Sequence, residues 1–273
     1  MVNIVTQAAF QARETIQNAA FLLLTNIVRV GPIPKHIALA IDTEDWLNNQ
    51  NELKTGDSSG VDFVSVERFA IACAELGIQN LTVYLSTAND DGDEKGRYLV
   101  YAMVRKMIFG MVEEKDGIAH AKSWRIRFTG NNDPMPMDVR DMVEEIETVT
   151  KDNTLMTINV CCPYGSRDEN IRALEHCGHE TIESFDGSEL SSNLMMATFS
   201  TGQRYPLDIL LRTSGRMTLG EFMCWEVAPS NQVHFVTISW PVFSKWEFYK
   251  LLLKWSYREA NTTASLPEEK DDK

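Results

Sequence analysis

The stretch PKHIALAIDTEDWLNNQ, residues 34–50, contains the segment that decides the fold. Ile37–Ile41 form an uninterrupted apolar run, which is typical of a β-strand buried on both faces. The strand leads directly into Asp42-Thr43-Glu44-Asp45, with three carboxylates in four positions. Carboxylates this close repel each other unless something positive lies among them. The sequence therefore raises the question of which positive group these acids hold.

Outward from this strand, the chain alternates predicted strands with predicted helices. Further strands are predicted at residues 81–86, 124–129, 156–162, 208–211 and 233–240, and helices at 3–30, 62–76, 95–115, 137–150, 167–177 and 244–258. This alternation is typical of α/β folds. We expect a single α/β domain over residues 32–260, with a central, mostly parallel β-sheet flanked by helices. An N-terminal helix (1–31) precedes it, and a disordered acidic tail (261–273) follows it.

Composition restricts the class of partner and the compartment. The 273 residues carry a net charge of −13, and 44% of them are hydrophobic, which excludes free nucleic acid as a partner and allows a substantial core. No apolar run is long enough to predict a transmembrane segment. The odd number of cysteines and the lack of a CxxC pair predict free, buried thiols in a cytoplasmic protein. These cysteines are Cys73, Cys161, Cys162, Cys177 and Cys224.

Polar side chains follow several of the predicted strands. Asp42, Ser86, the turn at 163–167 and Arg212 each come directly after a strand. Ligands of parallel sheets bind beyond the carboxyl ends of the strands. We therefore expect these residues to converge on one edge of the sheet.

The acidic triplet is a candidate metal site. Carboxylate oxygens suit Mg²⁺, which takes one or two carboxylates and completes its shell with water and phosphate oxygens. Asp42, Glu44 and Asp45 are thus predicted to hold Mg²⁺ against a diphosphate. The alternative is a solvated loop whose acids cap the next segment.

A second candidate is the turn Arg212-Thr213-Ser214-Gly215. An arginine, two hydroxyls and a glycine after a buried strand predict an anion cradle, in which the guanidinium, the hydroxyls and the backbone N–H groups point at one ligand. The alternative is an ordinary turn with an incidental arginine.

Read in order, these segments resemble the cis-prenyltransferase family, the undecaprenyl and dehydrodolichyl diphosphate synthases. The resemblance spans roughly residues 34–258. The family pattern PxHVAxIMDGNxRWA is similar to PKHIALAIDTEDWLN at 34–48, and LGIxxLTLYAFSxENW is similar to LGIQNLTVYLSTAN at 76–89. The pattern DLLIRTSGExRLSNFLLWQ is similar to DILLRTSGRMTLGEFMCWE at 208–226.

The resemblance implies a Mg²⁺-dependent enzyme that binds an allylic prenyl diphosphate and forms a homodimer. Carried over residue by residue, it implies catalytic roles for Asp42, Asn89 and Arg212. It also implies a substrate-binding set of Trp46, Ser86, Arg127, Arg167, Arg212, Thr213 and Ser214. A hydrophobic tunnel is expected from Trp46, Phe63, Tyr84, Met103 and Met107.

Departures from the family pattern leave three functions open. Thr43–Trp46 replace the family's Gly-Asn-x-Arg, and Thr218 replaces its second arginine, so contacts to both diphosphates change. The first hypothesis is a terpene synthase or cyclase that ionises one geranyl- or farnesyl-class diphosphate. The second is a divergent prenyltransferase that condenses prenyl diphosphates or prenylates another acceptor. The third is a non-catalytic partner subunit of a cis-prenyltransferase.

Overall fold

The computed structural model describes residues 15–16, 19–43, 66–86, 94–112, 117–131, 135–162, 164–169, 171, 206–224, 226–228 and 230–264. The chain divides into two compact units, one of residues 35–244 and one that combines 1–34 with 245–273. This division assigns the last helix to the same unit as the N-terminal segment, whereas the predicted domain limits kept that helix with the sheet.

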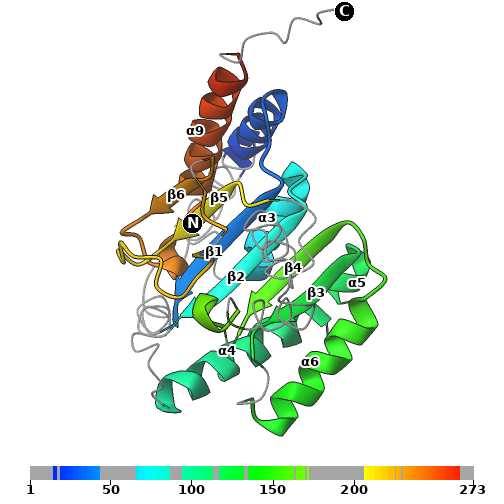
Figure 1. Ribbon diagram of the computed structural model, residues 1–273. Helices are drawn as coiled ribbons and strands as arrows, with labels where there is room; N and C mark the ends of the chain where they lie inside the picture. Colours follow the sequence, from blue (N-terminus) through cyan, green and yellow to red (C-terminus); the bar gives the residue numbers. More distant parts are fainter. Residues whose placement is uncertain are drawn as a thin grey trace, which may run out of the picture. The chain divides into compact units, whose positions relative to one another are not determined.

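The larger unit is built on a parallel β-sheet, which confirms the predicted α/β architecture. Its described strands lie in the order β3-β4-β2-β1-β5-β6, and every neighbouring pair is parallel (Figure 1). The strands are β1 (His36–Asp42), β2 (Asn80–Ser86), β3 (Trp124–Thr129), β4 (Met156–Cys161), β5 (Ile209–Arg212) and β6 (Gln232–Phe235).

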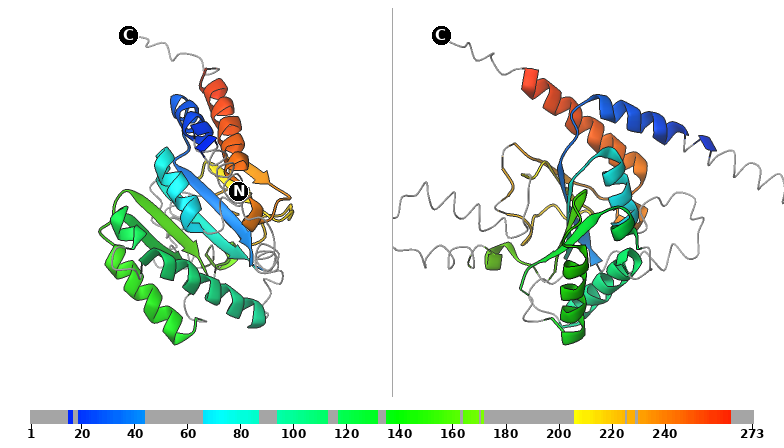
Figure 2. Two further views of the ribbon diagram at one scale, coloured as in Figure 1. Left: turned by 180° about the vertical axis from the view of Figure 1, so that it is seen from behind. Right: turned by 90° about the vertical axis from the view of Figure 1, so that its right-hand side faces the viewer.

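Helices cover the sheet and close one of its edges. They are α3 (Val66–Leu76), α4 (Glu94–Val112), α5 (Ile118–Ala121) and α6 (Met137–Thr150). In Figure 2, α3 and α4 lie on one face of the sheet, and the segment that follows β5 lies on the other. Helix α6 supplies partners to edge strand β3: the Ile126 N–H donates to Thr150 Oγ1 at 3.1 Å, and the Phe128 N–H donates to Glu147 Oε1 at 2.7 Å. These contacts satisfy backbone groups that an edge strand would otherwise expose.

Alternation along β1 gives the two faces of the sheet different chemistry. Ile37, Leu39 and Ile41 point to one face and are fully buried. The other face receives the alternate residues from His36 to Asp42, which are small or polar and also buried. Burial on both faces explains why the strand reads as a continuous apolar run.

Two predicted boundaries differ from the structure. Strand β6 ends at Phe235, because the carbonyls of Val236 and Ile238 accept hydrogen bonds from the turn after β5 rather than from a strand. The last helix, α9 (Lys245–Ala264), is longer than predicted and includes residues 261–264, which the sequence assigned to the disordered tail. The other predicted elements agree with the described residues to within a few positions at their ends.

The smaller unit pairs the helix of residues 19–30 with α9. The Phe21 ring lies 4.9 Å from the Trp246 ring and 5.8 Å from the Tyr249 ring, measured between centroids, and Thr25 Oγ1 lies 2.6 Å from the Tyr249 hydroxyl. The first helix ends at Gly31, where a Cβ would collide with Ser256 Oγ. None of the helices in the described part of the chain has the length and apolar character needed to cross a bilayer.

The cysteines agree only partly with the prediction of buried thiols. Cys73, Cys161 and Cys162 are free and buried. Cys224 is free but exposed, which corrects the prediction for that residue. Its neighbours Phe222 and Met223 turn toward the core, so Cys224 faces the other way. Residue 177 lies outside the described residues.

Candidate functional site

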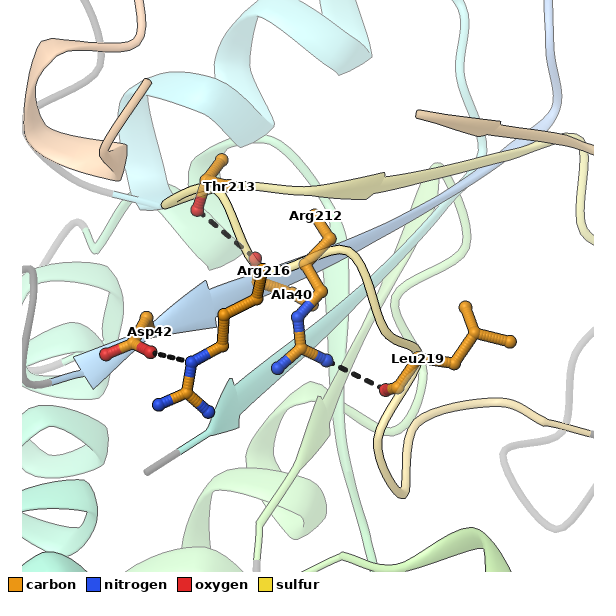
Figure 3. A network of polar contacts seen from close by, with 6 residues as sticks. All are labelled: Ala40, Asp42, Arg212, Thr213, Arg216 and Leu219. Carbon is orange, nitrogen blue, oxygen red and sulfur yellow. Dashed lines mark hydrogen bonds and ion pairs between the residues drawn. The ribbon is translucent and has the colours of Figure 1, made fainter. Parts of the chain in front are cut away.

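Asp42 is held by an arginine that the sequence did not single out. It is the last residue of β1, and its side chain is 8% exposed. Its Oδ2 atom lies 2.8 Å from Nε of Arg216 (Figure 3). The positive group at the end of the first strand is therefore a guanidinium from the loop after β5.

The turn between β5 and Arg216 reverses the chain toward β1. Ser214 and Gly215 have positive φ angles of 70° and 75°, which bring Arg216 back over the end of the sheet. The Ser214 N–H donates to the Ile238 carbonyl at 3.0 Å, and the Gly215 N–H donates to the Val236 carbonyl at 2.9 Å. The turn that carries Arg216 is thus anchored to the segment after β6.

Arg212 lies on the neighbouring strand at the same edge. It is 3% exposed, pairs in register with Ala40, and its Nη1 donates to the Leu219 carbonyl at 2.8 Å. Figure 3 shows the guanidinium groups of Arg212 and Arg216 on the same side of the strands, beside the Asp42 carboxylate. Two cations and one buried carboxylate therefore meet at one place.

The sheet topology makes this place a candidate ligand site. From β1 the chain continues to β2 on one side, whereas β5 is added on the other side of β1. The gap between β1 and β5 is thus a topological switch point, where open α/β sheets bind ligands beyond the carboxyl ends of their strands. Asp42 and Arg212 end these two strands.

Several donors of the predicted anion cradle make contacts other than those the prediction gave them. The Thr213 N–H and the Thr213 hydroxyl both donate to the Ala40 carbonyl, each at 3.3 Å. The Ser214 and Gly215 N–H groups donate to carbonyls of the β6 exit, as described above. These backbone donors hold the turn in place instead of pointing at a ligand.

Arg167 comes from the turn after β4, which is bound to the loop that carries Leu219. Its N–H donates to Glu221 Oε2 at 3.1 Å, and the Ser166 N–H donates to the Glu221 carbonyl at 2.7 Å. The Cys224 N–H donates to Ser166 Oγ at 3.0 Å. Glu221 therefore accepts hydrogen bonds from the first N–H groups of the short helix that begins at Ser166. These contacts hold the backbone at Arg167 against the loop after β5, whose Leu219 carbonyl binds Arg212.

Aromatic rings fill the space beneath these loops. Tyr84 stacks on Phe222, with ring centroids 4.8 Å apart, and Tyr164 meets both rings edge-on. Burial and the nearby Glu169 raise the pKa of the Tyr164 hydroxyl, which donates a hydrogen bond to Glu169 Oε2. The hydroxyl therefore keeps its proton at neutral pH.

The tunnel residues predicted from the sequence do not share one wall. Tyr84 lies on the sheet face beneath Phe222, together with Ala40. Met103 and Met107 are buried residues of α4, which lies on the opposite face (Figure 2). Trp46 and Phe63 lie outside the described residues.

Arg127 is not brought to the carboxyl edge. It lies on edge strand β3, three strands from β1, which is about 14 Å at the usual strand spacing. It is also level in register with Asn159 and Thr82, in the middle of the strands rather than at their ends. Burial and the adjacent Arg125 lower the pKa of the Arg127 guanidinium, and Glu147 partly offsets them. The substrate-binding role predicted for Arg127 has no support from this position.

Four other predicted site residues lie outside the described residues: Glu44, Asp45, Trp46 and Asn89. Ser86 ends β2 and pairs in register with Asp42, so its backbone is at the expected edge. No group of three metal-binding side chains occurs among the residues that the structure describes. Asp42 still has the oxygen donors that Mg²⁺ prefers, and a diphosphate and water would complete the shell.

Comparisons with known proteins identify the family of the chain. The family model described as "Putative undecaprenyl diphosphate synthase" matches residues 44–263. A dehydrodolichyl diphosphate synthase complex subunit of Schizosaccharomyces pombe is 28% identical over 243 residues, covering 85% of this chain and 89% of the relative. The tritrans,polycis-undecaprenyl-diphosphate synthase (geranylgeranyl-diphosphate specific) of Archaeoglobus fulgidus is 26% identical, covering 87% of this chain and 95% of the relative.

A solved structure shows the same fold at low sequence identity. Lavandulyl diphosphate synthase from Lavandula x intermedia, in complex with dimethylallyl diphosphate, superimposes with a TM-score of 0.63 at 17% identity, covering 82% of this chain and 95% of that one. Because the family model spans most of the sequence, the chain belongs to the undecaprenyl diphosphate synthase family, that is, to the cis-prenyltransferases.

Proposed function

We propose that this chain is a Mg²⁺-dependent prenyltransferase that binds an allylic prenyl diphosphate at the carboxyl edge of β1 and β5. The observation that carries the proposal is the meeting of buried Asp42 with the guanidinium groups of Arg212 and Arg216 at the topological switch point. Guanidinium groups bind phosphate oxygens through paired, charge-assisted hydrogen bonds.

Asp42 is the residue that would hold Mg²⁺, and the metal would neutralise charge on the departing diphosphate. Arg212 has the complementary role of fixing the diphosphate. It is 3% exposed and oriented by the Leu219 carbonyl, so its charge acts in a medium of low dielectric constant where it is stronger than in water. A charge that is already oriented requires no rearrangement when the bond to the diphosphate breaks.

The terpene synthase hypothesis has no comparable support. It depended on Glu44 and Asp45 as added metal ligands, and both lie outside the described residues. The relatives reported above are named as a diphosphate synthase and as a subunit of one. We therefore favour transfer of the prenyl group to a second substrate over cyclisation.

The test is a product assay on the purified chain. Geranyl, farnesyl and geranylgeranyl diphosphate are each incubated with and without isopentenyl diphosphate, in Mg²⁺ or in EDTA, and organic products and inorganic diphosphate are followed by mass spectrometry. We expect a longer prenyl diphosphate only when both substrates and Mg²⁺ are present. Release of diphosphate from one substrate alone, with a hydrocarbon or alcohol as product, would instead identify a cyclase.

A second candidate is a subunit that needs a partner chain. It is favoured by the Schizosaccharomyces pombe relative, whose name describes a complex subunit. This candidate predicts no product from the purified chain in any of the assays above, and activity when a partner synthase is added. The homodimer that the resemblance implies stays a prediction, which light scattering on the purified chain would test.

A further inference from the structure

The contact between Arg216 and Asp42 places two competing partners on one carboxylate. Arg216 Nε lies 2.8 Å from Asp42 Oδ2, within the range of a charge-assisted hydrogen bond. A Mg²⁺ ion on the same oxygen would lie against the guanidinium, and two cations at that separation repel each other. The guanidinium and a metal ion would therefore compete for Asp42 Oδ2.

Arg216 is more exposed to solvent than Arg212. The Arg216 side chain is 32% exposed, and its backbone is carried by the anchored turn. Arg212 is 3% exposed and is bound to the Leu219 carbonyl of its own loop. An arriving anion would thus meet one buried guanidinium and one that is partly exposed.

The sequence departs at this position from the pattern that it resembles. In the family pattern DLLIRTSGExRLSNFLLWQ, the position of Arg216 is a glutamate, and the position of Thr218 is an arginine. Relative to that pattern, the residue that meets Asp42 has the opposite charge, and the cation two positions later is absent. Arg216 is the cation of this loop that contacts the end of β1.

We propose that Arg216 is an exchangeable lock on Asp42. It holds the carboxylate until a diphosphate binds beside Arg212, then moves to the phosphate oxygens and leaves Asp42 open to Mg²⁺. Metal binding at Asp42 thereby follows diphosphate binding, and by linkage each ligand favours the other. The inference rests on the proposed function, because it takes the ligand to be a diphosphate.

The test measures inorganic diphosphate binding by calorimetry in EDTA, where no metal contributes. In the wild-type chain, diphosphate binding must also break the ion pair between Asp42 and Arg216. Asp42→Asn removes this cost and is expected to tighten diphosphate binding roughly tenfold, the equivalent of one charge-assisted hydrogen bond. Arg216→Gln is expected to weaken binding by a similar factor. In the double variant, the gain from Asp42→Asn should fall below about twofold, because no lock remains to be opened.

The Arg105–Asp138 ion pair provides a matched control. It is also an arginine–aspartate contact, but both side chains are exposed. Arg105→Gln, Asp138→Asn and their double variant should leave diphosphate binding unchanged. Circular dichroism and thermal melting verify that each variant is folded, and Arg216→Lys, which keeps the charge, should retain more affinity than Arg216→Gln.

Mn²⁺ binding gives a second readout, measured by electron paramagnetic resonance without diphosphate. The wild-type chain should bind Mn²⁺ weakly, Arg216→Gln at least about tenfold more tightly, and the double variant with Asp42→Asn weakly again. An equal gain from Asp42→Asn in both backgrounds, or no change in Mn²⁺ affinity with Arg216→Gln, would overturn the lock. If wild type makes product from prenyl diphosphates while these results fail, only the lock is refuted. If no variant binds diphosphate and no product forms, the proposed function fails with it.

Discussion

At the scale of single residues, the site is governed by the cost of burying Asp42. A carboxylate that is 8% exposed needs a positive partner, and the structure supplies Arg216. The sequence predicted the need for a positive group and proposed a metal among three acids, but it did not point to Arg216. Arg216 gave no local signal, since an arginine in a polar loop is usually solvated. The informative signal was its charge, opposite to that of the glutamate in the family pattern.

The first prediction concerns Asp42 itself. Asp42→Ala should lower kcat/KM by at least about a hundredfold, as loss of a charged group that acts in the transition state typically does. Steady-state kinetics with an allylic diphosphate and isopentenyl diphosphate measure the effect. Asp138→Ala removes an exposed aspartate that also pairs with an arginine, and it should leave kinetics unchanged. Full activity of Asp42→Ala would contradict the catalytic assignment.

At the scale of elements, the turn of residues 213–216 brings Arg216 to the carboxylate of Asp42 at the end of β1. Two consecutive residues with positive φ angles turn the chain back, and hydrogen bonds to Val236 and Ile238 anchor it. These same bonds end β6 early. The alternation of apolar residues continues past Phe235 and therefore predicted a longer strand. The pattern contains no information on the hydrogen bonds that the next carbonyls accept from the turn after β5.

The second prediction separates the turn's stability from its function. Gly215 has φ +75°, and Gly77, which follows α3, has φ +87°. Both changes to alanine should therefore cost about 1–2 kcal/mol of unfolding free energy, the usual penalty of this conformation. Urea denaturation monitored by circular dichroism measures it.

Only the first of these variants should also impair ligand binding. A shift at Gly215 moves Arg216, so Gly215→Ala should weaken diphosphate binding, whereas Gly77→Ala should leave it as in wild type. A Gly215→Ala variant that is destabilised but binds diphosphate normally would show that the turn's geometry does not position the arginine.

At the scale of the whole molecule, strand order determines which predicted residues meet. Each strand was predictable from its own residues, and so was the edge at which their ends lie. The order β3-β4-β2-β1-β5-β6 was not, because it is set by long-range packing. That order brings Arg212 next to Asp42 and keeps Arg127 on a distant edge strand, although both arginines were predicted as substrate ligands.

The same sheet should couple ligand binding to global stability. Cys162 directly follows β4, is buried, and donates its N–H to the Thr129 carbonyl at 3.1 Å. Burial raises the pKa of its thiol to about 12, so the folded protein keeps it protonated and unreactive at pH 8. Labelling of Cys162 therefore requires the sheet to open.

The third prediction uses this thiol as a reporter. In a variant whose other cysteines are replaced by alanine, the rate of reaction with a thiol reagent at pH 8 should fall when inorganic diphosphate and Mg²⁺ are added. The expected factor is 1 + [L]/Kd, about a hundredfold at one hundred times Kd, because the ligand binds only the folded sheet. Since the unfolded thiol loses its proton near its ordinary pKa, well below 12, stability should also decline as pH rises above about 9. Undiminished labelling at saturating diphosphate would mean that β4 opens locally, independently of the site at β1 and β5.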